Sequence, residues 1–150
     1  MSDQEHLYEV DISWKQGRIG SMTSPKLNQE IEVATPPEFP GGVEGIWSPE
    51  HLFVSSVASC FMTTFLAIAE YSKLEFENLR INAIGKLGKA EDGKVMVTEI
   101  ILKPDLAITD EKFTDKAKRI MQKADAACII SRSIKSKIIL ESKVSVGALN

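Results

Sequence analysis

The sequence predicts an α+β domain in which antiparallel sheets surround one long central helix. Residues near both ends of the chain alternate between apolar and polar, the period of half-buried strands. Between them, 18 residues from Leu52 to Ala69 carry no charge, which predicts a central helix. We expect one domain over residues 1–150, because a chain of this length typically buries roughly two thirds of its unfolded surface.

The composition is that of a soluble globular domain, with 43% hydrophobic residues, 26% charged residues and a net charge of -3. The chain has no run of Lys or Arg, so we expect neither a nucleic acid nor an anionic membrane as a partner. Residues 1–6 are polar and acidic, unlike a secretory signal, which favours a cytoplasmic location. Two cysteines in a reducing compartment are typical of free thiols.

The N-terminal part predicts three strands followed by a loop. Alternating apolar and polar residues indicate a strand over 7–15, and further strands are expected over 19–24 and 25–33. Arg18 lies in the first turn, where a glycine on each side relaxes the backbone limits. Prolines and glycines then interrupt regular structure, so 34–46 is predicted to be a loop.

A long helix is expected to begin at Ser48-Pro49-Glu50. Serine can accept a hydrogen bond from the free N–H groups of a helix start, proline fits the first helical position, and an acid favours the dipole. The uncharged stretch that follows is long enough to cross a membrane. Five of its residues are Ser or Thr and it ends in Glu70, so we instead predict a core helix that is buried nearly all round.

The C-terminal part predicts a hairpin, a helix and a closing strand. Alternating residues around a glycine turn indicate a long hairpin over 79–102, which Pro104 is expected to end. Apolar residues at helical spacing predict a helix over 110–124, and a short further helix is possible over 126–131. A single strand is expected over 138–146.

Cys60 lies in the middle of the predicted central helix, on a stripe with Ser56 and Thr64 at four-residue spacing. It can be read as a small buried hydrophobic residue beside a tightly packed neighbour. A reactive thiol would instead need a positive charge or hydrogen bonds that stabilise the thiolate. Arg18 is the candidate cation.

Cys128 also has two interpretations. Alone, it is the kind of cysteine that is usually buried and inert. As a partner for Cys60, it could condense with a sulfenic acid formed by a peroxide, which yields a disulfide and water. A disulfide requires Cα atoms within roughly 7 Å. The 67 residues between the cysteines leave this question open.

Glu50 can be either an ordinary helix-start acid or the residue that holds Arg18. A helix rises about 1.5 Å per residue, so Glu50 lies roughly 15 Å along the helix from Cys60. If it serves such a site, it serves that of another chain, most simply in a symmetric dimer. His6 and His51 lack the paired spacing of zinc ligands, so we expect no metal, and no flavin or haem is required.

Three segments together resemble the OsmC/Ohr family of thiol peroxidases. They are Ser48-Pro49-Glu50-His51-Leu52, Ser59-Cys60-Phe61 and Ala127-Cys128-Ile129-Ile130-Ser131. The resemblance implies an OsmC-like fold and an intertwined homodimer with two sites at its interface. Two positions depart from better-known members: Ile19 follows the arginine, and Ile129 follows Cys128 where many members have proline.

The resemblance also implies a role for each site residue. Cys60 would be the peroxidatic nucleophile, Cys128 the resolving cysteine, Arg18 the cation that stabilises the thiolate, and Glu50 the acid that orients Arg18. The expected activity is reduction of organic hydroperoxides, with the Cys60–Cys128 disulfide recycled by a dithiol reductant. A redox sensor or an apolar-ligand-binding module without enzymatic activity is the alternative. Four residues either line the substrate site or belong to the core: Trp47, Phe53, Phe61 and Met62.

Overall fold

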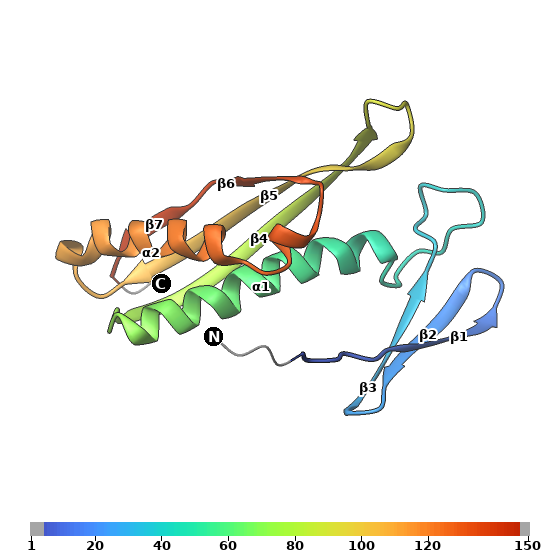
Figure 1. Cartoon of the computed structure of the whole chain (residues 1–150), viewed down its shortest axis with the longest axis horizontal. Helices are drawn as coiled ribbons and strands as arrows, with labels where there is room; N and C mark the ends of the chain where they lie inside the picture. Colours follow the sequence, from blue (N-terminus) through green and yellow to red (C-terminus); the bar gives the residue numbers. More distant parts are fainter. Residues whose placement is uncertain (1–4, 148–150) are drawn as a thin grey trace. The chain divides into compact units, whose positions relative to one another are not determined.

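The computed structural model describes residues 5–147 and consists of two structural units, Met1–Leu52 and Phe53–Asn150 (Figure 1). Helix α1 (Pro49–Tyr71) begins in the first unit and continues in the second. Residues 1–4 belong to the polar start that predicts no secretory signal, and they lie outside the described residues.

The first unit contains a three-stranded antiparallel sheet in the order β1-β2-β3. Its strands are β1 (Asp11–Gln16), β2 (Ile19–Ser24) and β3 (Leu27–Ala34), so all three predicted strands are confirmed. Strand β1 begins four residues later than expected, and all its side chains are exposed. Gly17, with a φ of 52°, forms the turn between β1 and β2, where the Trp14 indole donates to its carbonyl at 3.0 Å.

The loop after β3 returns to the sheet just before helix α1 begins. Val33 and Trp47 form an isolated parallel bridge, and the Ala34 N–H donates to the Trp47 carbonyl at 2.8 Å. Ser48 is fully buried, and its hydroxyl accepts from the His51 N–H at 3.1 Å. Ser48 therefore caps the helix as predicted, with proline in the first helical position.

In the second unit, α1 contributes one apolar stripe to the core. The buried residues are spaced at four, as expected for one helix face: Val57, Phe61, Phe65 and Ala69. The prediction that the helix is buried nearly all round is wrong, since Met62 and Leu66 are 38% and 39% exposed. Within residues 5–147, the fully buried positions of α1 lie on one side of the helix. Although α1 is long and apolar enough to span a membrane, this packing makes it a core helix.

The sheet of the second unit is built on the long hairpin of β4 (Phe76–Lys89) and β5 (Val95–Ile108) (Figure 1). Two short strands pair with β5 in the parallel sense, β6 (Lys137–Leu140) and β7 (Lys143–Val146). The predicted single closing strand is therefore two strands. The α+β class is confirmed, and this second sheet is mixed rather than wholly antiparallel.

Pro104 does not end its strand, contrary to the prediction, because β5 continues to Ile108. On one edge, β5 pairs with β6 up to Leu102 and with β7 from Asp105 onward. Pro104 lies at the break between these two ladders. Its missing N–H therefore removes no hydrogen bond on that edge, which is why a proline is tolerated inside this strand.

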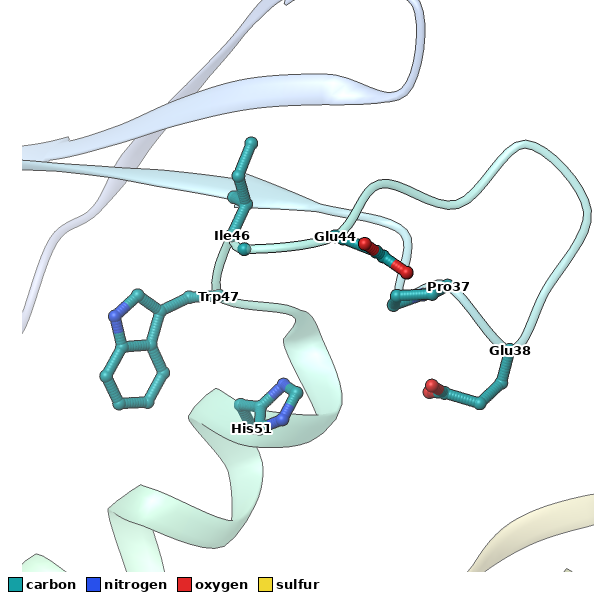
Figure 2. A pocket seen from close by; sticks show the side chains of 7 residues that line it. Pro37, Glu38, Glu44, Ile46, Trp47 and His51 are labelled. Atoms are coloured by element: carbon teal, nitrogen blue, oxygen red, sulfur yellow. The ribbon is translucent and has the colours of Figure 1, made fainter.

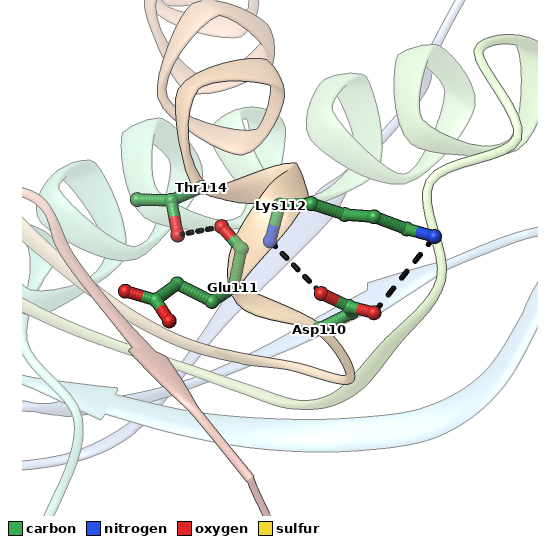
Figure 3. A network of polar contacts seen from close by, with 4 residues as sticks. All are labelled: Asp110, Glu111, Lys112 and Thr114. Carbon is green, nitrogen blue, oxygen red and sulfur yellow. Dashed lines mark hydrogen bonds and ion pairs between the residues drawn. The ribbon is translucent and has the colours of Figure 1, made fainter.

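The second helix is α2 (Thr114–Ala127). A 3-10 turn, η1 (Glu111–Phe113), precedes it. Asp110 accepts from the Lys112 N–H at 2.9 Å, while the Thr114 hydroxyl donates to the Glu111 carbonyl at 2.8 Å (Figure 3). These bonds satisfy free backbone groups where the chain enters the helix. The predicted helix is confirmed and extends three residues further. Its buried face consists of Ala117, Ile120, Met121 and Ala124.

The prediction of a separate short helix over 126–131 is wrong. Helix α2 takes the first part of that range, and a 3-10 turn, η2 (Ser131–Ser133), follows. Cys128 lies between them in an extended conformation, with φ -64° and ψ 115°. The chain therefore leaves the helix at the cysteine itself.

Candidate active site

The structure groups the four predicted site residues in two pairs, one in each unit. Arg18 and Glu50 belong to the first unit, and Cys60 and Cys128 belong to the second. Each pair has its own local geometry.

Arg18 and Glu50 line one open pocket of about 450 Å³ in the first unit. Arg18 reaches it from the turn between β1 and β2, and Glu50 from the first turn of α1. The other lining residues are mainly apolar: Thr35, Pro36, Phe39, Pro40 and Pro49. The guanidinium and the carboxylate are therefore the two charged groups at an otherwise largely apolar surface.

The Glu50 carboxylate has an unsatisfied oxygen. Its Oε1 atom is buried and has no hydrogen-bond partner within residues 5–147. Over the same residues, the ion pairs within 4.0 Å do not include one between Arg18 and Glu50. A buried acceptor without a donor is costly, so this oxygen is available to a donor that enters the pocket.

Gly41 lies directly against the Arg18 side chain. It has a φ of +80°, and a Cβ atom added to it would lie 3.2 Å from Arg18 Nε. The loop therefore limits the positions that the guanidinium can take. The sequence indicated Gly41 only as one of several glycines that break regular structure, so this contact was missed.

Cys60 and Cys128 come together in the second unit. Cys60 is partly buried on α1, Cys128 is 1% exposed at the end of α2, and both are free thiols. The two thiols lie close enough for each to affect the pKa of the other. The packing of α1 and α2 in one core thus brings the two sulfur atoms together across 67 intervening residues.

The surroundings of Cys60 favour its thiolate. Burial raises the pKa of Cys60, but hydrogen bonds from the Ile130 backbone, the Cys128 thiol, the Thr64 hydroxyl and the Ile129 backbone lower it. The net effect is a pKa below the ordinary value for a cysteine. A larger fraction of Cys60 is therefore ionised near neutral pH, and the thiolate is the reactive form.

Cys128 has the opposite tendency. Burial raises its pKa most, and the neighbouring Cys60 raises it further, while hydrogen bonding with Ser131 only partly offsets these effects. Of the two thiols, Cys60 is therefore the one that ionises first as the pH rises.

The backbone donors to Cys60 come from a turn that is held by its own hydrogen bonds. The Arg132 N–H donates to the Cys128 carbonyl at 3.1 Å, and the Ser133 hydroxyl donates to the Ile129 carbonyl at 2.8 Å. This turn presents the Ile129 and Ile130 backbone toward the sulfur. Sequence reasoning named hydrogen bonds as one way to stabilise the thiolate, but no residue pattern identifies main-chain donors.

The family model of OsmC-like proteins matches residues 42–143 of this chain. The chain belongs to the OsmC family. Two relatives of this OsmC-family protein match nearly its full length. The uncharacterized protein YmaD of Bacillus subtilis is 27% identical over 147 residues, covering 95% of each chain. The organic hydroperoxide resistance protein-like 2 of Staphylococcus saprophyticus is 28% identical over 143 residues, covering 94% of this chain and 97% of that protein.

A solved OsmC-family structure has the same fold. It is an OsmC-like protein of unknown function from Vibrio cholerae, with a TM-score of 0.85 and 25% identity, covering 92% of this chain and 99% of that chain. The expected OsmC-like fold is thereby confirmed.

The four residues proposed as a substrate lining divide between core and surface in this OsmC-family protein. Phe61 is fully buried in the core of the second unit, and Phe53 packs against that core. Met62 and Trp47 remain partly exposed, at 38% and 53%. Phe61 and Phe53 are therefore core residues, as the alternative interpretation held.

Trp47 lines a different open pocket of the first unit, about 470 Å³ in volume (Figure 2). Its ring lies edge-on to His51 at 6.1 Å, and His51 Nδ1 is hydrogen-bonded to the Ser48 hydroxyl at 2.7 Å. Figure 2 shows that Glu38 and Glu44 also line this pocket. No group of three His, Cys, Asp or Glu residues suited to a metal ion occurs in the described part of the chain.

Proposed function

We propose that this OsmC-family protein is a cysteine-based peroxidase that reduces organic hydroperoxides in the cytoplasm. The observation that carries the proposal is the neighbouring pair of Cys60 and Cys128, in which the pKa of Cys60 is lowered and that of Cys128 is raised. The name of the Staphylococcus relative supports organic hydroperoxides as the substrate class.

In the first step, the Cys60 thiolate attacks the terminal oxygen of the hydroperoxide. The O–O bond breaks, the sulfur is oxidised to a sulfenic acid, and the alkoxide leaves and takes a proton from water to become an alcohol. Arg18 would stabilise the negative charge that moves onto the departing oxygen. Glu50 would hold the guanidinium in place, and its unsatisfied buried oxygen supports this role.

In the second step, the sulfur of Cys128 attacks the sulfur of the sulfenic acid. The S–S bond forms as the S–O bond breaks, and the hydroxide combines with the proton of Cys128 to leave as water. A dithiol then reduces the disulfide by two thiol–disulfide exchanges and is itself oxidised to a disulfide. The nearness of the two thiols supports this resolving role for Cys128.

We infer that the active form is an intertwined homodimer of one OsmC-like domain over residues 1–150. Apolar side chains are left exposed on both units, and a second copy would cover them: Ile12 and Trp14 on β1, and Met62 and Leu66 on α1. A symmetric arrangement would place Arg18 and Glu50 of one subunit at the cysteines of the other.

The first test is the intact mass of the reduced protein after one equivalent of cumene hydroperoxide. We expect the loss of two hydrogens, the signature of an intramolecular disulfide, and no such loss in Cys60→Ser. Repeated turnover with a dithiol such as dithiothreitol distinguishes an enzyme from a redox sensor, which would be oxidised only once. An unchanged mass with both thiols free would reject the proposal and favour a binding role.

A further inference from the structure

Thr64 lies one helical turn after Cys60, so both side chains occupy the same face of α1. Its Oγ1 atom is 4.0 Å from the Cys60 sulfur, which is within reach of a hydrogen bond to this large atom. Thr64 is also half-buried, which limits competition from water. The geometry therefore places a hydroxyl beside the reacting sulfur.

The other hydroxyls around Cys60 behave differently. Ser56, Ser59 and Thr63 each donate to the backbone carbonyl three residues earlier, the usual arrangement for these residues in a helix. The hydrogen bond that the structure gives to the Thr64 side chain goes to the sulfur instead. Thr64 thus differs from its neighbours in the partner of its hydroxyl.

The direction of this hydrogen bond follows from the charge on the sulfur. The other groups near the Cys60 sulfur, the backbone of Ile129 and Ile130 and the Cys128 thiol, each lower its pKa. Cys128 is also the titratable group among these partners. A thiolate has no proton to give and can only accept, so Thr64 donates whenever Cys60 is ionised.

We propose that Thr64 is a further catalytic residue, whose hydroxyl donates a hydrogen bond to the Cys60 thiolate and holds it as a nucleophile. This inference rests on the proposed peroxidase function. The bond increases the fraction of Cys60 that is ionised at neutral pH, and it restrains the sulfur on the helix face that meets Cys128. Neither effect requires a cation.

The test compares Thr64→Val, which replaces the hydroxyl with a methyl group, and Thr64→Ser, which keeps a hydroxyl. The matched control is Thr63→Val, since the Thr63 hydroxyl bonds the Cys60 carbonyl at 3.1 Å rather than the sulfur. Alkylation of Cys60 by iodoacetamide is followed against pH by peptide mass, which needs no peroxide. Turnover of cumene hydroperoxide by the unaltered protein is measured separately.

We expect Thr64→Val to raise the pKa of Cys60 and to reduce alkylation at pH 7 about fivefold, in the range of one modest hydrogen bond to a charged group. Thr64→Ser should stay near the unaltered profile, and Thr63→Val should match it. An unchanged profile in Thr64→Val, or an equal shift in Thr63→Val or Thr64→Ser, overturns the role of the hydroxyl. Failure of the peroxidase proposal is seen separately, as absence of turnover in the unaltered protein.

Discussion

Cys60 and Cys128 lie close to each other in the second unit, and their pKa values move in opposite directions from that of an ordinary cysteine. The two cysteines have the same side chain but different tendencies to ionise. Cys60 receives most of its hydrogen bonds from neutral donors, whereas Cys128 is dominated by burial. The roles proposed for them, nucleophile and resolving thiol, agree with this difference in their surroundings.

Substitution of the two cysteines should have unequal effects. We expect Cys60→Ser to abolish peroxide reduction, because it removes the attacking sulfur. Cys128→Ser should permit one oxidation and then overoxidation of Cys60 to the sulfinic acid, since no thiol is left to condense with the sulfenic acid. Intact mass after stepwise addition of cumene hydroperoxide measures both. Equal loss of oxidation in the two variants would contradict the assigned roles.

The first oxidation should depend on pH through the Cys60 thiolate. Because the pKa of Cys60 is lowered, the rate is expected to be nearly constant above that pKa and to fall as the pH decreases through it. Cys128, with a raised pKa, should be alkylated only at higher pH. Rapid-mixing kinetics from pH 5 to 10 with site-specific mass analysis would measure this, and a reversed order of the two thiols would refute it.

Ile129 allows the backbone donors to be tested with one substitution. Ile129→Pro removes the N–H, and the extended conformation of Cys128 is compatible with a following proline. We expect a higher pKa for Cys60 and slower alkylation at pH 7, because a hydrogen bond to the sulfur is lost. Ile129→Ala is the control, since it keeps the N–H and the Ile129 side chain is 71% exposed. Identical profiles for proline and alanine would exclude this donor.

Gly41 provides a test of how the Arg18 side chain is placed. Gly41→Ala should destabilise the protein by about 1–2 kcal/mol, because φ is +80°, and should slow peroxide reduction by displacing Arg18. Gly45→Ala is a matched control with the same φ of +80° and nothing within 4 Å of the added Cβ. Urea unfolding and turnover are measured for both. Equal turnover in the two variants would mean that the Arg18 contact has no functional role.

The proposed disulfide should stabilise the fold. Joining Cys60 to Cys128 closes a loop of about 70 residues, and the loss of entropy in the unfolded chain corresponds to up to about 4 kcal/mol. We expect a higher urea midpoint for the oxidised protein than for the reduced protein, and no such difference in Cys128→Ser. A lower midpoint on oxidation would show that the bridge strains the native structure.

Much of the fold follows from local sequence patterns. The alternation that predicts the hairpin and the serine–proline–acid start of α1 each involve only a few neighbouring residues. Both can therefore be recognised from the sequence alone. The effect of Pro104 was predicted wrongly, because β5 accepts a proline only at the break between β6 and β7. Both of these strands are distant from Pro104 in the sequence. The exposed side of α1 was missed for a similar reason: hydrophobicity alone does not show how much of a helix its own chain covers.

The candidate site divides in the same way. Resemblance to a family predicts Arg18, Glu50, Cys60 and Cys128 as site residues from their type and order. The donors to Cys60 were not predicted, because the main-chain groups of Ile129 and Ile130 are the same for almost any side chain at these positions. The sequence places Thr64 on the same helix face as Cys60. Only the structure shows that its hydroxyl bonds to the sulfur rather than to a helix carbonyl.

The break at Pro104 has a consequence for dynamics. Because β6 and β7 pair with β5 as separate four-residue ladders, we expect β6 to open by local unfolding without β7. Strand β6 follows closely on the turn that starts at Cys128. A brief opening of this one ladder would loosen the turn and admit a reductant to a sulfur that is otherwise enclosed. Such an opening would let the proposed disulfide be reduced without global unfolding.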